Sequence, residues 1–249
     1  MRREDLDSNK FVGIYTIILT VITVLVILFG AYRFFGRGAI AWVGESKKVA
    51  DTVTCDPFTA IDVELNVAEL RVEYGEEYKV SYDITAKGVE HYVPEIKSEG
   101  SVLTLKQDAS DQKRFGTGSY KCEIRVTIPK GTELERLYVA ANVGDIRCDG
   151  ISCKDVKLTS NVGDMRLDGM VSDTLTISSN VGDVRVTGGT IETIDITSDV
   201  GDTEINGTVS EKVKVNCEIG DVELNNVHNA AGEDPITDLH SGVGDEKIN

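Results

Sequence analysis

An aspartate follows a glycine at a fixed interval along the carboxyl-terminal half of the sequence. The first five glycines are 19 residues apart, and a sixth follows after 24 residues. The pairs are Gly144-Asp145, Gly163-Asp164, Gly182-Asp183, Gly201-Asp202, Gly220-Asp221 and Gly244-Asp245. If each interval is one coil of a stack, neighbouring carboxylates lie about 4.8 Å apart and repel by about 1 kcal/mol in water. One interpretation that offsets this repulsion is structural: each carboxylate accepts backbone N–H bonds within its own turn.

The residues that flank these pairs change character in the fourth and fifth copies. Arginines stand two residues after the aspartate in the first three copies, at Arg147, Arg166 and Arg185, so an aspartate column can pair with an arginine column. The later copies instead form an acidic patch of Asp199, Asp202, Glu204, Glu218, Asp221 and Glu223. Such a patch could attract Ca²⁺ or a basic partner. The spacing differs from the nine-residue glycine-rich calcium repeat, and a solvated acidic face explains the same residues.

Residue types that perform catalysis are sparse and scattered. The histidines are His91, His228 and His240, none at a metal-ligand spacing, and the sequence has no GxSxG, HExxH or phosphate-loop motif. A carbohydrate-cleaving solenoid needs aromatic platforms, and Tyr138 is the only aromatic residue of the repeat region. We therefore predict that the protein is not an enzyme and has no catalytic, cofactor-binding or metal-ligating residues beyond the acidic patch.

The cysteines do not indicate a disulfide framework. They are five in number, lack CxxC or zinc-type spacing, and lie at Cys55, Cys122, Cys148, Cys153 and Cys217. We interpret Cys148 as a small buried apolar residue. The sequence leaves the redox compartment open.

Aligning the copies reveals four apolar columns that must position these residues. The columns are Leu137, Val156, Leu175, Ile194 and Val213; Val139, Leu158, Ile177, Ile196 and Val215; Val143, Val162, Val181, Val200 and Ile219; and Cys148, Leu167, Val186, Ile205 and Leu224. Polar residues alternate with them, which predicts two short strands per coil with all four columns pointing inward. A single copy cannot enclose a core, but stacked copies can. The sequence therefore predicts an all-β fold, a single-stranded parallel β-solenoid with about 19 residues per coil.

Two further features set the expected domain plan. A second corner is marked by Gly150, Gly169, Gly188, Gly207 and Asn226, where Asn also tolerates left-handed geometry. We expect the regular solenoid over 137–249 and a degenerate capping part of the same architecture over 53–136, in which Val67–Val72 echoes the repeat. Residues 33–52 are expected to form a stalk.

The amino-terminal region carries a membrane signal. Residues 11–32 contain no charged side chain, and a helix of this length spans roughly 33 Å against a hydrocarbon core of about 30 Å. We predict a transmembrane helix over 11–32 after a tail over 1–10. A cleaved signal peptide is the alternative, because Ala39-Ile40-Ala41 resembles a cleavage site. Basic residues flank both ends of the run in nearly equal number, so the positive-inside rule hardly favours either orientation. We expect the carboxyl-terminal part to be exported, with a cytoplasm-facing domain as the alternative.

The distribution of charge limits the classes of partner that the protein can bind. Residues 1–50 hold 7 of the 26 Lys/Arg and 4 of the 42 Asp/Glu, which leaves −19 on the remainder. Such a surface repels nucleic acid, so we predict no nucleic-acid partner, while cations and basic partners are admissible.

The motif Ser160-Asn161-Val162-Gly163-Asp164-Met165-Arg166-Leu167-Asp168-Gly169 and its copies resemble the repeat of a bacterial family called "putative adhesins", a β-solenoid domain of unknown function (DUF4097). The resemblance covers roughly residues 55–249. It implies a membrane-anchored member acting as a non-catalytic binding or scaffold module at the cell envelope. The ligand would be an envelope polymer, a cationic peptide or a protein, besides the membrane lipid around residues 11–32. The alternative it implies is a regulatory or sensing component of an envelope-stress response, working with a partner membrane protein.

Overall fold

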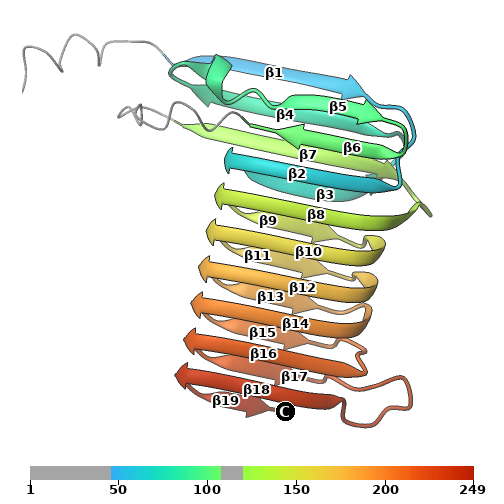
Figure 1. Cartoon of the computed structure of the whole chain (residues 1–249), viewed down its shortest axis with the longest axis vertical. Coiled ribbons are helices and arrows are strands. Elements are labelled where there is room, and N and C mark those ends of the chain that lie inside the picture. The colour runs from blue at the N-terminus through green and yellow to red at the C-terminus, as the bar shows by residue number, and fades with distance from the viewer. Residues whose placement is uncertain (1–45, 108–119) are drawn as a thin grey trace, which may run out of the picture. The chain divides into compact units, whose positions relative to one another are not determined.

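Each repeat folds into one coil, built from a long strand and a short strand that lie in two different sheets (Figure 1). The computed structural model describes residues 46–107 and 120–249. In the regular part the long strands β8, β10, β12 and β14 have 11 residues each, and the short strands β9, β11, β13 and β15 have 4. The prediction of two short strands per coil is therefore right in number and wrong for the length of one of them.

The short strands belong to a ten-stranded sheet, here called sheet A. In spatial order its strands are β1 (Lys47–Thr54), β4 (Lys79–Ala86), β7 (Lys121–Pro129), β3 (Glu69–Gly75), β9 (Ile146–Asp149), β11 (Met165–Asp168), β13 (Val184–Thr187), β15 (Thr203–Asn206), β17 (Val222–Asn225) and β19 (Glu246–Ile248).

The long strands belong to a nine-stranded sheet, here called sheet B. In spatial order its strands are β18 (Ile236–Val243), β16 (Lys212–Ile219), β14 (Thr190–Val200), β12 (Val171–Val181), β10 (Ser152–Val162), β8 (Glu133–Val143), β2 (Ala60–Val67), β6 (Val102–Lys106) and β5 (Glu95–Glu99). A 3-10 helix, η2 (Val89–His91), lies between β4 and β5 along the chain.

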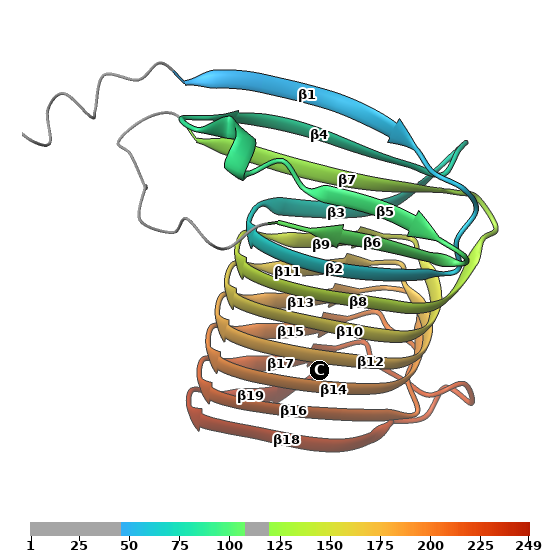
Figure 2. The same ribbon diagram turned by 45° about the horizontal axis from the view of Figure 1, so that its top comes forward.

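Register follows the repeat. Leu175 on β12 lies beside Val156 on β10 and Ile194 on β14, and all three strands are parallel. Apolar residues of one column therefore lie side by side on neighbouring coils. Figure 2 shows the stack of long strands that this register produces. The all-β fold with parallel sheets is confirmed.

Three of the four predicted apolar columns form the core between the sheets. The columns that begin at Leu137, Val139 and Cys148 are buried on every coil. The column that begins at Val143 is not, since Val181 is 46% exposed. The inward position at that end of each long strand is held two residues earlier by Ala141, Ser160, Ser179, Ser198 and Cys217. The prediction was wrong here because the strict alternation of a strand stops where the chain bends into the corner.

The corner glycine is required by close stacking of the backbone. Gly182 has φ near +140°, and a Cβ there would lie 2.2 Å from the carbonyl oxygen of Gly163 on the preceding coil. The second corner is different, because Gly207 has φ +62° and a Cβ added to it would meet no atom within 4 Å. Asn226 takes its place on the next coil with φ +53°. Both corners therefore favour glycine through a positive φ, and the first corner adds steric exclusion by the preceding coil.

The first part of the described chain departs from the regular coil. β2 and β3 pair in parallel with β8 and β9, so the echo at Val67–Val72 is a true coil. By contrast β4 runs antiparallel to both β1 and β7, and β5 runs antiparallel to β6. These strands extend both sheets beyond the first coil at the end away from β18 and β19 (Figure 1).

The expected stalk over 33–52 needs correction. Residues 47–52 belong to β1, which hydrogen-bonds to β4, because Val49 and Val53 alternate with polar residues as a strand requires. The remainder of that stretch, the tail over 1–10 and the predicted span over 11–32 lie outside the described residues. Within residues 46–107 and 120–249, no helical segment has the length and apolar content that crossing a membrane needs.

Candidate functional site

The repeated aspartates form a ladder that links successive coils. The carboxylate of Asp164 accepts the backbone N–H of Asp183 at 3.0 Å, and Asp183 in turn accepts the N–H of Asp202 at 2.9 Å. The same bond recurs from Asp145 to Asp164, from Asp202 to Asp221 and from Asp221 to Asp245. We expected each carboxylate to bind within its own turn, whereas the acceptor reaches the N–H of the next coil. These bonds offset the repulsion between stacked carboxylates and account for the acid after each glycine.

An arginine row crosses sheet A beside this ladder. In-register pairing places Arg125, Arg71, Arg147, Arg166 and Arg185 on five adjacent strands, followed by Glu204, Glu223 and Lys247. Acidic neighbours hold the first of these arginines: Arg71 contacts Asp149 at 2.6 Å, and Arg125 contacts Glu73 at 2.9 Å. The hydrogen bond that Arg71 donates to Asp149 is the main cause that raises the pKa of Arg71.

The expected pairing between the aspartate and arginine columns is only partly present. Arg147 lies 3.7 Å from Asp145, while Arg185 turns to Glu204 on the next coil at 2.7 Å. An arginine row therefore meets a glutamate row at β13 and β15, and the opposite charges bond across the boundary.

The predicted acidic patch is divided by the fold. Asp202, Glu204, Asp221 and Glu223 line a groove of about 300 Å³ on sheet A, together with Arg166 and Arg185. Asp199 and Glu218 lie instead near the ends of the long strands β14 and β16 and do not line that groove. Cations already contact two of the glutamates, since Lys247 lies 3.2 Å from Glu223 and Arg185 contacts Glu204. In the described part of the chain, no cluster of three or more His, Cys, Asp or Glu side chains is arranged to hold a metal ion.

A ladder of asparagine amides crosses sheet B near the carboxyl ends of its long strands. The amide of Asn142 donates to Asn66 at 3.1 Å, Asn161 donates to Asn142 at 2.7 Å, and Asn180 donates to Asn161 at 3.2 Å. Asp199 occupies the next place in the column, where no amide donor is available. The sequence shows this column, but its bonding was not anticipated, because side-chain ladders require exact stacking of the coils.

The cysteines are free thiols. Burial raises the pKa of Cys148 and of Cys153 to about 12, and that of Cys122 to about 11. Cys148 has no exposed surface, as its place in an apolar column predicts. The buried thiols are therefore packing residues and poor nucleophiles near neutral pH.

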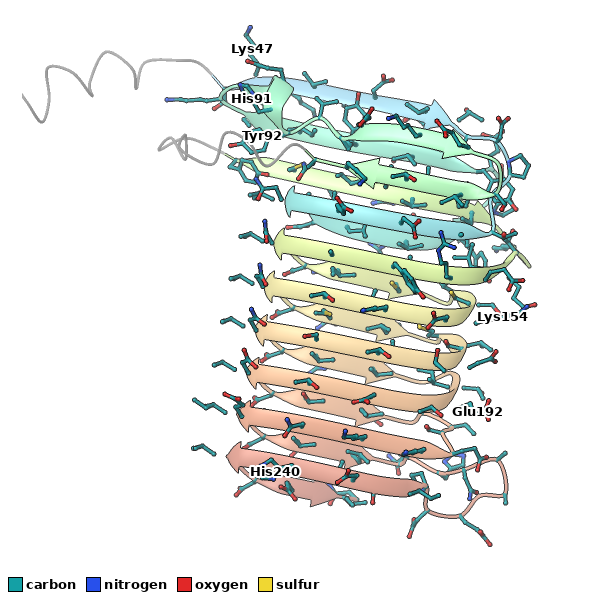
Figure 3. All side chains as sticks on the ribbon, in the orientation of Figure 1. Lys47, His91, Tyr92, Lys154, Glu192 and His240 are labelled. Carbon is teal, nitrogen blue, oxygen red and sulfur yellow. The ribbon has the colours of Figure 1, made fainter. Side chains whose placement is uncertain are left out.

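A larger groove, of about 810 Å³, lies on the outer face of sheet B across β6, β2, β8 and β10. The side chains of this face stand in columns along the stack (Figure 3). Arg136 forms two hydrogen bonds with the carboxylate of Asp62, at 3.1 and 2.9 Å. Its guanidinium carbon lies 5.7 Å from the centre of the Tyr138 ring. The Tyr138 hydroxyl donates to Asp155 at 2.5 Å, which is the main cause that raises its pKa.

Sequence reasoning found Tyr138 but not its surroundings. The sequence shows Tyr138 as the only aromatic residue of the repeat region, which argues against a carbohydrate-cleaving site. The residues that complete the groove are Asp62, Glu64 and Lys106, which precede the regular repeats in the sequence. The echo at Val67–Val72 aligns Val67 with Val143 and therefore Asp62 with Tyr138, so it could have located β2 beside β8. No periodic signal marks where β6 joins the sheet.

Comparison with known proteins places the fold. A crystal structure of a "putative adhesin" from Bacteroides fragilis is 17% identical, with a TM-score of 0.52 over 82% of this chain and 97% of that one. A "putative cell adhesion protein" from Clostridium sporogenes is 16% identical, with a TM-score of 0.46 over 82% and 99%. A "putative lipid binding protein" from Parabacteroides distasonis is 13% identical, with a TM-score of 0.38 over 82% and 98%. None of the curated proteins compared with the chain matches it.

At these identities the B. fragilis structure supports the fold alone. The family model is more decisive, because the Toastrack DUF4097 model matches residues 58–237, which include the first coil and nearly all of the regular repeats. The chain belongs to the Toastrack DUF4097 family.

Proposed function

We propose that this protein is a membrane-anchored, extracytoplasmic binding or scaffold module of the bacterial cell envelope, adhesin-like and non-catalytic. The observation that carries the proposal is the pair of long outer faces on which polar side chains stand in register, coil after coil. Such solenoid faces bind extended partners in other repeat proteins, because many weak contacts add along the stack. The B. fragilis structure carries the name "putative adhesin", and the binding role that we propose for this chain is consistent with that name.

The membrane anchor in this proposal rests on the sequence. The uncharged run over 11–32 is long enough to cross a bilayer as a helix, and the first described strand, β1, begins at Lys47, soon after this run in the sequence. The partners that we propose are membrane lipid around that run and an envelope polymer, a cationic peptide or a protein along the solenoid. The net charge of −16 disfavours nucleic acid and favours cationic peptides at low ionic strength.

Alkaline carbonate extraction of cells that express the full chain tests the anchor. We expect the chain to stay in the membrane pellet, and a variant without residues 11–32 to be released. A full chain that appears in the carbonate supernatant would contradict the proposal. Control extraction of a known integral membrane protein from the same cells shows that the pellet retains spanning helices.

Replacing residues 11–32 with an unrelated spanning helix tests the role of the solenoid. A binding module should keep its envelope binding, because the solenoid carries the contacts. If binding persists but an envelope-stress response is lost, a regulatory component that acts through helix contacts becomes the better account.

A further inference from the structure

Tyr138 is held rigidly on an otherwise aromatic-free face of the regular coils. Its ring is 38% exposed. Arg136 lies against the ring, and the hydroxyl is fixed by Asp155, whose other carboxylate oxygen accepts a hydrogen bond from Thr174 at 2.9 Å. A ring fixed at both its face and its hydroxyl loses little conformational entropy when a ligand packs against it.

The groove beside this ring is open, polar and close to charge-balanced. Asp62 pairs with Arg136, and Glu64 pairs with Lys106 at 3.2 Å, so two ion pairs stand within it. Its floor is low at Ala140, which lies between Glu64 on β2 and Thr159 on β10 in the register of the sheet. Lys157 also lines the groove and makes no ion pair with any residue that the structure describes. The groove therefore offers hydrogen-bond donors and acceptors at short intervals around one aromatic surface.

That combination selects a ligand by its chemistry. Hydroxyl groups both donate and accept, so they bond to carboxylates and to cationic side chains alike. The flat apolar C–H face of a sugar ring packs on an aromatic ring, whose face carries negative partial charge. The volume of about 810 Å³ falls within the range of small-ligand sites and suits a short oligosaccharide. An apolar ligand would leave the ion pairs unsolvated, and an acidic polymer would be repelled by the net charge of −16.

We propose that this groove binds an uncharged glycan, with one sugar stacked on the part of the Tyr138 ring that Arg136 leaves exposed and its hydroxyls bonded by the Asp62–Arg136 pair, the Glu64–Lys106 pair and Lys157. This inference rests on the proposed binding role and names the ligand class that the surface takes. It assigns Tyr138 as the main specificity residue. The ion pairs position polar atoms on both sides of it.

Calorimetric titration of the purified full chain in detergent tests the assignment, with cellotetraose and chitotetraose as neutral probes and tetragalacturonate as the acidic probe. We expect at least one neutral probe to bind with a dissociation constant at or below about 1 mM, nearly independent of salt between 50 and 500 mM. The acidic probe should bind at least tenfold more weakly. Failure of both neutral probes to bind, or tighter binding of the acidic probe, would overturn the assignment.

Variants locate the binding on this groove. Tyr138→Ala should weaken the neutral probe at least tenfold, while Tyr138→Trp, which keeps a stacking ring, should retain binding and show that the fold is intact. Thr176→Ala is the matched control, because Thr176 lies in the same row of sheet B two strands from Tyr138. Equal affinities for Tyr138→Ala and Thr176→Ala would place the site elsewhere. Titration of the purified chain does not depend on where the protein resides, so its failure is separate from a failure of carbonate extraction.

Discussion

The two glycine corners should differ sharply in their tolerance of a side chain. Gly182→Ala adds a methyl group that would lie 2.2 Å from the carbonyl oxygen and 2.6 Å from the carbonyl carbon of Gly163. Both contacts are with backbone of the preceding coil, so they cannot be relieved by a rotamer change. Gly207→Ala adds a methyl group that meets no atom within 4 Å.

The structure gives a magnitude for each change. At Gly182, φ near +140° costs an alanine about 1–3 kcal/mol. Moving the two coils apart to admit the methyl group also weakens the hydrogen bonds between them at this corner, which join Gly163 to Val181 at 2.9 Å and Asp183 to Asp164 at 3.0 Å. At about 1 kcal/mol for each bond, the total loss is about 3–5 kcal/mol. Gly207→Ala carries only the left-handed penalty of about 1–2 kcal/mol, and Gly207→Asn should cost less, because Asn226 already occupies this corner on the next coil.

Urea unfolding monitored by circular dichroism measures the difference. With a denaturant slope of about 2–3 kcal/mol/M, Gly182→Ala should lower the unfolding midpoint by more than about 1 M, and Gly207→Asn by less than about 0.5 M. Gly207→Ala should fall between them. Similar midpoints for Gly182→Ala and Gly207→Ala would refute the view that coil-to-coil contact selects the first glycine.

Three further changes test other parts of the account. Asp183→Ala removes an acceptor of the next coil's N–H and should cost about 1 kcal/mol, whereas Asp183→Asn keeps an acceptor oxygen and should stay within about 0.5 kcal/mol in the same urea assay; equal losses would count against the ladder. Val181→Thr should change stability by less than about 0.5 kcal/mol because the side chain is exposed. Val186→Thr places a hydroxyl in the core and should cost about 1–3 kcal/mol. A larger loss for Val181→Thr than for Val186→Thr would mean that the Val181 column points inward after all. Burial raises the pKa of Cys148 and Cys153 from 9.0 to about 12, so the folded state favours the neutral thiols. The free energy of unfolding should therefore be constant below pH 9 and fall by about 1.4 kcal/mol per pH unit per thiol between about pH 9 and 12. A double variant with alanine at both positions should lose most of this fall and keep a smaller one between about pH 9 and 11, because burial also raises the pKa of Cys122 to about 11. An unchanged slope would assign the fall to other groups.

The regular half of the fold was predictable because its period is carried by residue type. A Gly-Asp pair that recurs every 19 residues, together with apolar columns such as that of Leu175, predicts a stack of parallel coils. The sequence likewise predicts that Asn226 can replace glycine at the second corner. Its φ of +53° is a conformation that asparagine adopts more readily than most other residues with a side chain.

The remainder depended on geometry that no period encodes. Val181 precedes a corner, and whether it points inward depends on where the strand stops alternating. Asp183 binds the next coil because stacking brings that N–H within reach, which local turn chemistry does not reveal. The antiparallel strands β1 and β4 follow no repeat, so the stalk was drawn too long at its carboxyl-terminal end.

The groove at Tyr138 shows the same limit for the candidate site. Asp62 and Tyr138 are far apart in sequence but face each other across β2 and β8. The echo at Val67–Val72 sets the register between β2 and β8, but it does not reveal the side-chain bonds that hold the Arg136–Asp62 pair beside the ring. The predicted acidic patch was wrong for the converse reason, because residues close in sequence are separated by the fold. Asp199 lies in the long strand β14, whereas Asp202 lies past the corner and lines the groove on sheet A.

The most direct test of the central claim is the side of the membrane on which the solenoid lies. Asp238→Cys places a thiol at an exposed position of β18, and intact cells that express the full chain are treated with a membrane-impermeant thiol reagent. The unsubstituted chain is the control, because its own cysteines include the partly exposed Cys55. We predict strong labelling of the variant above that control before lysis. Labelling that appears only after lysis would place the solenoid in the cytoplasm and contradict the account.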